Sequence, residues 1–175
     1  MNNHAIKSGL MVGVISIVVT LLLYLVDPTM LAAMWVGITI FVVVLALVAY
    51  FGIQHRKEVG GYMAFGKAWV YSMQVFIVAG ILGTVFNILL YNVIDPELPG
   101  IIADKAVENA ESMMRNFGMP EDQMDEALDK AREDTINRTS VVGSLTGFLW
   151  GLIVYAILSL ITGAIIKKKE PEFEE

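Results

Sequence analysis

The last apolar stretch of the chain, residues 140–166, constrains the fold more than any other segment. At about 1.5 Å per residue, a helix of this length crosses the roughly 30 Å hydrocarbon core of a bilayer. Lys167, Lys168 and Lys169 follow directly, and such a basic cluster is typical of an anchor at the membrane surface. The sequence therefore predicts a transmembrane helix here, and a fold that is built within a bilayer.

Three further apolar runs have the length of a membrane span. The four predicted spans are residues 9–26, 30–53, 70–94 and 140–166. Asp27-Pro28 ends the first span and Asp95-Pro96 ends the third, because proline cannot continue a helix. With 56% hydrophobic and 17% charged residues, the chain is too apolar for an ordinary soluble domain. We expect an all-α integral membrane protein, a four-helix bundle in which residues 1–175 form a single membrane domain.

Residues 95–138, between the third and fourth spans, differ in character from the rest of the chain. By direct count they hold twelve acids and five bases. Apolar stripes at helical spacing run through residues 102–117 and again through residues 124–131. Gly118 suits the end of one helix and Pro120 the first turn of the next. The pattern predicts a two-helix hairpin insert that stands outside the bilayer. The second of its helices either runs straight into the last span or ends at a cap there.

The distribution of Lys and Arg predicts the orientation of the chain. Seven of these residues lie in short segments beside span ends: Lys7, Arg56, Lys57, Lys67, Lys167, Lys168 and Lys169. The other five are spread through the acidic segment 95–138. The positive-inside rule counts only the basic residues, so it predicts that both termini are cytoplasmic and that the hairpin is extracytoplasmic. His4 and His55 also fall at the predicted cytoplasmic margin.

Two sets of small or polar residues recur at every fourth position on the third and fourth spans. They are Ala79, Gly83 and Asn87 on the third span, and Gly143, Gly147 and Gly151 on the fourth. Small residues at this spacing let two membrane helices approach closely, and a side-chain amide in lipid needs a hydrogen-bond partner. We expect the glycine set to pack against the third span or against another copy of the chain. The alternative is that glycine is simply frequent in membrane helices.

An aromatic and basic group precedes the third span. Tyr62, Phe65 and Trp69 fall at positions i, i+3 and i+7 of a predicted helix, and Lys67 lies among them. Aromatic rings of this kind prefer the headgroup region, where a lysine can extend its ammonium toward the phosphates. The group predicts an interfacial anchor.

The sequence predicts no catalytic, cofactor-binding or metal-binding residues. The chain has no cysteine, its predicted spans hold no charged residue, and Ser144 has no histidine at its depth. The acids of residues 121–129 lack the spacing of a calcium loop and fit the solvated face of a helix. An enzyme acting on lipid would have to work through polar residues at the cytoplasmic rim, such as His55. We therefore expect no enzyme activity, no cofactor and no nucleic-acid partner.

Three stretches of the chain resemble a known family. They read GGYMAFGKAW at residues 60–69, FGMPEDQM at residues 117–124 and SLITGAIIKKK at residues 159–169. With the order of the segments, they resemble the domain of unknown function 4199 family, which comprises small four-span proteins of Gram-negative bacteria. The resemblance covers nearly the whole chain. It implies a bacterial inner (cytoplasmic) membrane protein with a periplasmic hairpin, and it carries over no catalytic residue.

Helix-packing surfaces and a protruding acidic hairpin, without chemical machinery, favour a non-enzymatic interaction, regulatory or structural membrane subunit. The alternative is an oligomeric small-solute channel or transporter, which would need several copies because four spans alone enclose little volume. The expected partners are the lipid bilayer and either a second copy of the chain or a membrane protein that binds the hairpin.

Overall fold

The computed structural model describes residues 3–170, and the chain is helical through most of this range. Four helices are long and apolar enough to cross a membrane. They are α1 (Asn3–Val26), α2 (Met34–Glu58), α3 (Phe65–Leu89), which a π-helical stretch η2 (Leu90–Ile94) extends, and α6 (Val141–Ile166). The described residues contain no strand, so the predicted all-α class with four membrane-length helices is confirmed.

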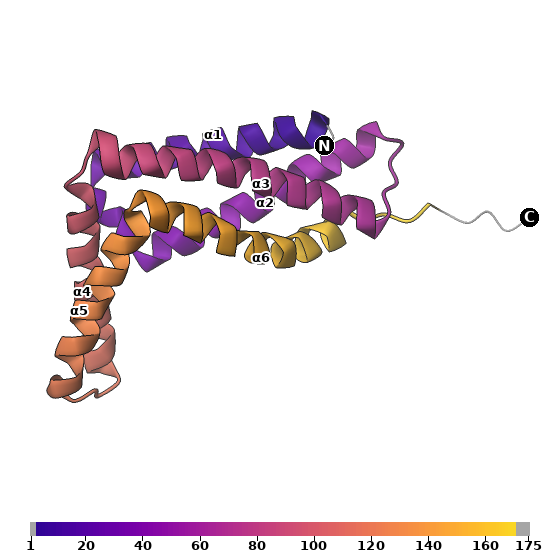
Figure 1. The fold of residues 1–175 in the computed structure, drawn as a ribbon. Helices are drawn as coiled ribbons and strands as arrows, with labels where there is room; N and C mark the ends of the chain where they lie inside the picture. The colour runs from indigo at the N-terminus through magenta and orange to yellow at the C-terminus, as the bar shows by residue number, and fades with distance from the viewer. Residues whose placement is uncertain (1–2, 171–175) are drawn as a thin grey trace, which may run out of the picture. The chain divides into compact units, whose positions relative to one another are not determined.

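Two compact units divide the described chain, and the same four long helices contribute residues to both. Within the described residues, unit 1 comprises residues 3–16, 40–83 and 148–170, and unit 2 comprises residues 17–39 and 84–147. In unit 1 the start of α1, the link from α2 to α3 and the end of α6 lie at one end (Figure 1). The α2–α3 link is short, so the end of α2 and the start of α3 lie together at this end, and an isolated bridge between Met63 and Lys168 joins the link to the segment after α6.

The turn between α1 and α2 explains why the second helix begins later than residue 30, where the sequence predicts the start of the span. Asp27 Oδ1 accepts hydrogen bonds from the Thr29 N–H at 2.9 Å and the Thr29 hydroxyl at 2.7 Å. This cap starts a short 3₁₀ helix, η1 (Pro28–Ala32), with proline in its first turn. The extended residue Ala33 ends η1, so α2 begins only at Met34.

Unit 1 has its own apolar core. Its fully buried members come from all four long helices and include Val12, Val48, Val75 and Ile166. The helices approach closely where one of them carries a glycine. A methyl group at Gly52 of α2, for example, would collide with the end of the Ile166 side chain of α6. The apolar part of α2 ends at Ile53, and its last turn is polar.

Unit 2 contains the predicted helical hairpin. Helices α4 (Leu98–Asn116) and α5 (Glu121–Thr139) lie side by side (Figure 1), and an ion pair of 2.9 Å joins Arg132 to Asp104. Gly118 between them has a φ of +71°, which confirms its predicted role as the end of the first hairpin helix. Leu98 and Ile102 of α4 are buried in a small core with Leu90 of η2.

The hairpin is fixed at both of its ends by capping side chains. Asp95 Oδ1 accepts from the N–H groups of Glu97 and Leu98, each at 3.1 Å, while Asp95 Oδ2 accepts from the Tyr24 hydroxyl at 3.0 Å. At the other end, extended Ser140 separates α5 from α6, and its Oγ accepts from the Gly143 N–H at 3.0 Å. Of the two alternatives at this junction, the capped break is therefore the correct one.

Candidate functional site

One end of unit 1 gathers basic side chains on segments that are distant in the sequence. We call it the basic end; its basic residues are Lys7, Arg56, Lys57, Lys67, Lys167, Lys168 and Lys169. Met63 of the α2–α3 link and Lys168 exchange two backbone hydrogen bonds of 2.9 Å. The guanidinium of Arg56 donates to the Ile166 carbonyl at 2.6 Å. These contacts fix the link between α2 and α3 against the end of α6.

The residues of the predicted interfacial anchor lie at the basic end. Lys168 Nζ is 5.3 Å from the centre of the Tyr62 ring, and Lys167 Nζ is 5.8 Å from the centre of the Phe65 ring, both within the range of cation–π attraction. Trp69 instead donates its indole N–H to the Ala156 carbonyl of α6 at 3.1 Å, so it also joins two helices. Anchoring of this group at a membrane surface stays a prediction.

Two histidines and a tyrosine form a stack of three rings at this end. The rings of His4, in the first turns of α1, and His55, in the last turn of α2, have centroids 4.8 Å apart and planes 26° apart. His55 also stacks on Tyr71 of α3, with 4.9 Å between centroids and 14° between planes. Ser8 and Tyr71 share a hydrogen bond of 2.8 Å between their hydroxyl groups. His55 is only 7% exposed, so its ring orientation is fixed by packing.

Glu58 completes this cluster. Its Oε2 lies 3.1 Å from His4 Nδ1 and 3.9 Å from His55 Nδ1. One ligand atom from each of these three residues lies within 4.8 Å of the others, so the group has the composition and proximity of a metal site. His55 is beyond the apolar part of α2. Burial lowers the pKa of its imidazole, as does the charge of His4, while Glu58 opposes both effects.

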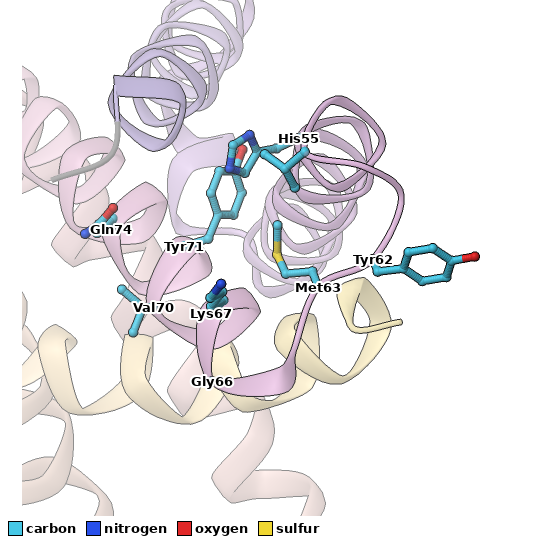
Figure 2. A pocket seen from close by; sticks show the side chains of 9 residues that line it. His55, Tyr62, Met63, Gly66, Lys67, Val70, Tyr71 and Gln74 are labelled. Atoms are coloured by element: carbon cyan, nitrogen blue, oxygen red, sulfur yellow. The ribbon is translucent and has the colours of Figure 1, made fainter. Parts of the chain in front are cut away.

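A pocket of about 480 Å³ opens beside the stack (Figure 2). His55 and Tyr71 form part of its lining, together with Met63, Lys67 and Gln74. Tyr62 also lines the pocket, although Figure 2 shows its ring directed away from the other labelled side chains. The lining combines apolar surface with an ammonium, a phenol and an amide, and it is suited to a small amphipathic group.

The glycines predicted as a packing surface of α6 have their nearest neighbours close in the sequence, and none of those neighbours belongs to α3. A methyl group at Gly143 would collide with the Asn137 carbonyl at the α5–α6 break, so glycine is required there by the break itself. At Gly151 a methyl group would lie 3.5 Å from the Tyr155 ring of the same helix. At Gly147 it would meet no described atom within 4 Å. Close packing of this face against another copy stays a prediction.

The three residues predicted as a packing surface of α3, Ala79, Gly83 and Asn87, do not share one neighbouring helix. Ala79 lies beside α1, because a methyl group at Gly13 would be 3.3 Å from Ala79 Cα. Gly83 has open space where a side chain would point, and Asn87 is half-buried. In unit 2, the neighbouring amide of Asn92 makes an interhelical hydrogen bond, donating to the Thr139 carbonyl at 3.2 Å.

Sequence reasoning missed both the histidine–glutamate cluster and the glycines at the closest helix contacts. Gly9 and Gly13 of α1 lie against α3. A methyl group added at Gly163 of α6 would lie 3.2 Å from the backbone of Trp69. The four-residue spacing of Gly9 and Gly13 was a usable signal for the first contact. For the cluster, the usable signal was that His4 and His55 occur at the same predicted margin of two antiparallel spans.

Four membrane-length helices with a helical hairpin between the third and the fourth define an all-helical, multi-pass membrane protein. The chain belongs to the family described as Protein of unknown function (DUF4199), whose model matches residues 7–168. This confirms the resemblance seen in the sequence. Neither the curated proteins nor the solved structures include a match to the chain.

Proposed function

We propose that the chain is a non-enzymatic interaction subunit of a bacterial inner membrane, with cytoplasmic termini and a periplasmic α4–α5 hairpin that binds a protein partner. The charge distribution supports the orientation. Seven of the twelve Lys and Arg residues belong to the basic end, whereas the hairpin segment 95–138 holds twelve acids against five bases. The bacterial inner membrane is the location that the family resemblance implies.

The observation that carries the binding proposal is the apolar tip of the hairpin. Phe117 is 83% exposed where α4 ends, and Met113 and Met119 beside it are 47% and 38% exposed. The sequence predicts Phe117 as part of an apolar stripe along α4, but the helix ends at this residue and leaves its ring at the turn. Large aromatic side chains that are exposed on a polar element mark contact surfaces, because burying them against a partner is strongly favourable.

The charge around this tip indicates what a partner should look like. The hairpin carries more acids than bases, and its described ion pairs leave most of the acids facing solvent. A protein surface with an apolar pocket and a basic rim complements an exposed aromatic ring within an acidic surround. Burial of the ring in such a pocket would supply most of the affinity, and pairing of the basic rim with the acids would set the orientation of the complex.

Photo-crosslinking in intact cells tests this proposal. A photoreactive phenylalanine analogue placed at Met119 should form a discrete adduct with one protein of defined mass. The same analogue placed at Glu133, which is exposed on α5 away from the tip, is the matched control. A second variant that carries the analogue at Met119 and Phe117→Ser should lose the adduct, since the anchoring ring is gone.

The proposal is contradicted if the tip position forms adducts only with lipid, or if Phe117→Ser leaves the protein adduct unchanged. Equal adducts from positions 119 and 133 would likewise show that the tip is not the binding surface. Purification of each variant by gel filtration confirms that the substituted chains are folded.

An oligomeric channel or transporter is the second candidate, and the uncovered face of α6 favours it. A methyl group added at Gly147 would have no described atom within 4 Å, so a second copy has room to approach there. Gly147→Ile should then abolish both assembly and solute flux, whereas Gly37→Ile, an equally open site on α2, should preserve them. A wild-type protein that is monomeric in mild detergent contradicts this candidate.

A further inference from the structure

We propose that His4, His55 and Glu58 form a binding site for one divalent transition-metal ion of the Zn²⁺ class. The site lies at the basic end, between the first turns of α1 and the last turn of α2, and all three residues belong to unit 1. It is independent of the hairpin and of any partner that the hairpin binds.

The distances within the cluster suit a metal ion. In a tetrahedral zinc site with ligand bonds of about 2.0–2.2 Å, neighbouring ligand atoms lie roughly 3.3–3.6 Å apart. The distances from Glu58 Oε2 to His4 Nδ1 and His55 Nδ1 are 3.1 and 3.9 Å, and no ligand atom of the group is more than 4.8 Å from another. The His4 ring is 53% exposed and would turn out of its stack on His55, so that the in-plane nitrogen lone pairs of both rings point at one ion; the exposed Glu58 carboxylate would move with it.

The donor set selects the class of ion. Imidazole nitrogens suit zinc and the neighbouring transition metals, whereas calcium and magnesium prefer sites made entirely of oxygen. Two imidazoles and one carboxylate are also the protein ligands of many zinc sites that keep a fourth position for water. In this cluster His4 and Glu58 are each more than half exposed, so water has access to that position.

The surroundings of His55 provide the support that a ligand needs. Its ring is stacked against Tyr71, and Tyr71 is in turn hydrogen-bonded to Ser8 at 2.8 Å. Groups behind a ligand that fix its orientation commonly change metal affinity by about 10–100-fold. His55 is therefore a preoriented ligand, and His4 and Glu58 are adjustable ligands that close around the ion.

A bound ion would connect the start of α1 to the end of α2. Because the ligands are brought together only in the folded chain, the free energy of metal binding adds to the stability of the fold. Zn²⁺ should therefore raise the unfolding temperature of the wild-type protein, and this increase should disappear when a ligand is removed.

The test uses the full-length protein without a polyhistidine tag, purified in mild detergent and stripped with a chelator. Zn²⁺ is titrated in competition with a chromophoric chelator, and native mass spectrometry reports the number of ions bound. We expect one ion per chain, and a loss of about tenfold or more in affinity for His4→Ala and for Glu58→Gln. Glu108→Gln is the matched control, because Glu108 is also an exposed acid in an i,i+3 pair.

The proposal is overturned if the wild-type chain binds no Zn²⁺, or if His4→Ala and Glu58→Gln bind it as tightly as the wild type does. His4 is 53% exposed, so its replacement does not disturb the core, and an unchanged gel-filtration profile confirms folding. Loss of binding in Glu108→Gln to the same extent would also overturn it, because the effect would then follow overall charge rather than the cluster.

Discussion

Replacement of Gly9 by alanine tests how closely α1 and α3 approach. A methyl group at Gly9 would lie 2.6 Å from Val78 Cβ, 2.9 Å from Val78 Cγ1 and 3.0 Å from the Val75 carbonyl oxygen. Carbon atoms in favourable contact are about 3.5–4.0 Å apart, so roughly 1 Å of space is missing. The nearest atoms include Val78 Cβ, whose position is set by the backbone, and a backbone oxygen, so no side-chain rotation relieves the contact and the two helices must separate.

The expected cost follows from two opposing effects. Overpacking of a close contact typically costs about 1–3 kcal/mol. Alanine recovers up to about 1 kcal/mol relative to glycine through its higher helix propensity. With the full propensity gain, we therefore expect Gly9→Ala to lower the free energy of unfolding by up to about 2 kcal/mol, which shifts the folding equilibrium by up to roughly 30-fold toward the unfolded state.

The assay is equilibrium unfolding in mixed micelles of mild detergent and sodium dodecyl sulfate, followed by circular dichroism. Gly37→Ala is the control, because a methyl group there meets no described atom within 4 Å. Gly37→Ala should be as stable as the wild type or slightly more stable. If Gly9→Ala matches Gly37→Ala in stability, α1 and α3 do not meet at Gly9 and the packing described for unit 1 is wrong.

Two further predictions concern the capping aspartates. Asp95→Ala should destabilise the start of α4 by about 1–2 kcal/mol, seen as faster amide hydrogen exchange in its first turns, because the carboxylate caps that helix and accepts from Tyr24. Asp95→Asn, which keeps one acceptor oxygen, should lose less. For Asp27, the hydrogen bonds from Thr29 lower the pKa of the carboxyl group. Its contribution to stability is therefore complete above the unfolded pKa of about 3.9 and is lost as the pH falls through the lower folded value. The stability difference between wild type and Asp27→Ala should be constant from pH 7 to pH 5 and should shrink below about pH 4; a difference independent of pH would contradict this role.

The number of long helices and the hairpin turn were predictable because they depend on signals local in the sequence. The length of an apolar run, which predicts a span, is visible directly in the sequence. Glycine often ends a helix because it tolerates positive φ, and Gly118 has a φ of +71°. The late start of α2 at Met34 was not predictable from hydropathy. It depends on the side chain of Asp27 capping a short turn through apolar residues that would otherwise continue the span.

The candidate site was beyond the reach of these local signals. His4 lies at the start of the chain, and Glu58 lies in the last turn of α2, so only the antiparallel pairing of α1 and α2 brings them together. The same reason applies to the glycines. A four-residue spacing shows that Gly147 and Gly9 are both available for close packing, but only the arrangement of the helices shows that Gly9 meets α3 while Gly147 faces open space.

The orientation of the chain in the membrane is the central claim, and cysteine labelling tests it most directly. Because the chain has no cysteine of its own, each single-cysteine variant reports one position. Lys57→Cys is exposed at the basic end and Glu133→Cys is exposed on the hairpin. In spheroplasts treated with a membrane-impermeant maleimide, Glu133→Cys should be labelled at once and Lys57→Cys only after lysis. Labelling of Lys57→Cys before lysis, or protection of Glu133→Cys until lysis, would contradict the account.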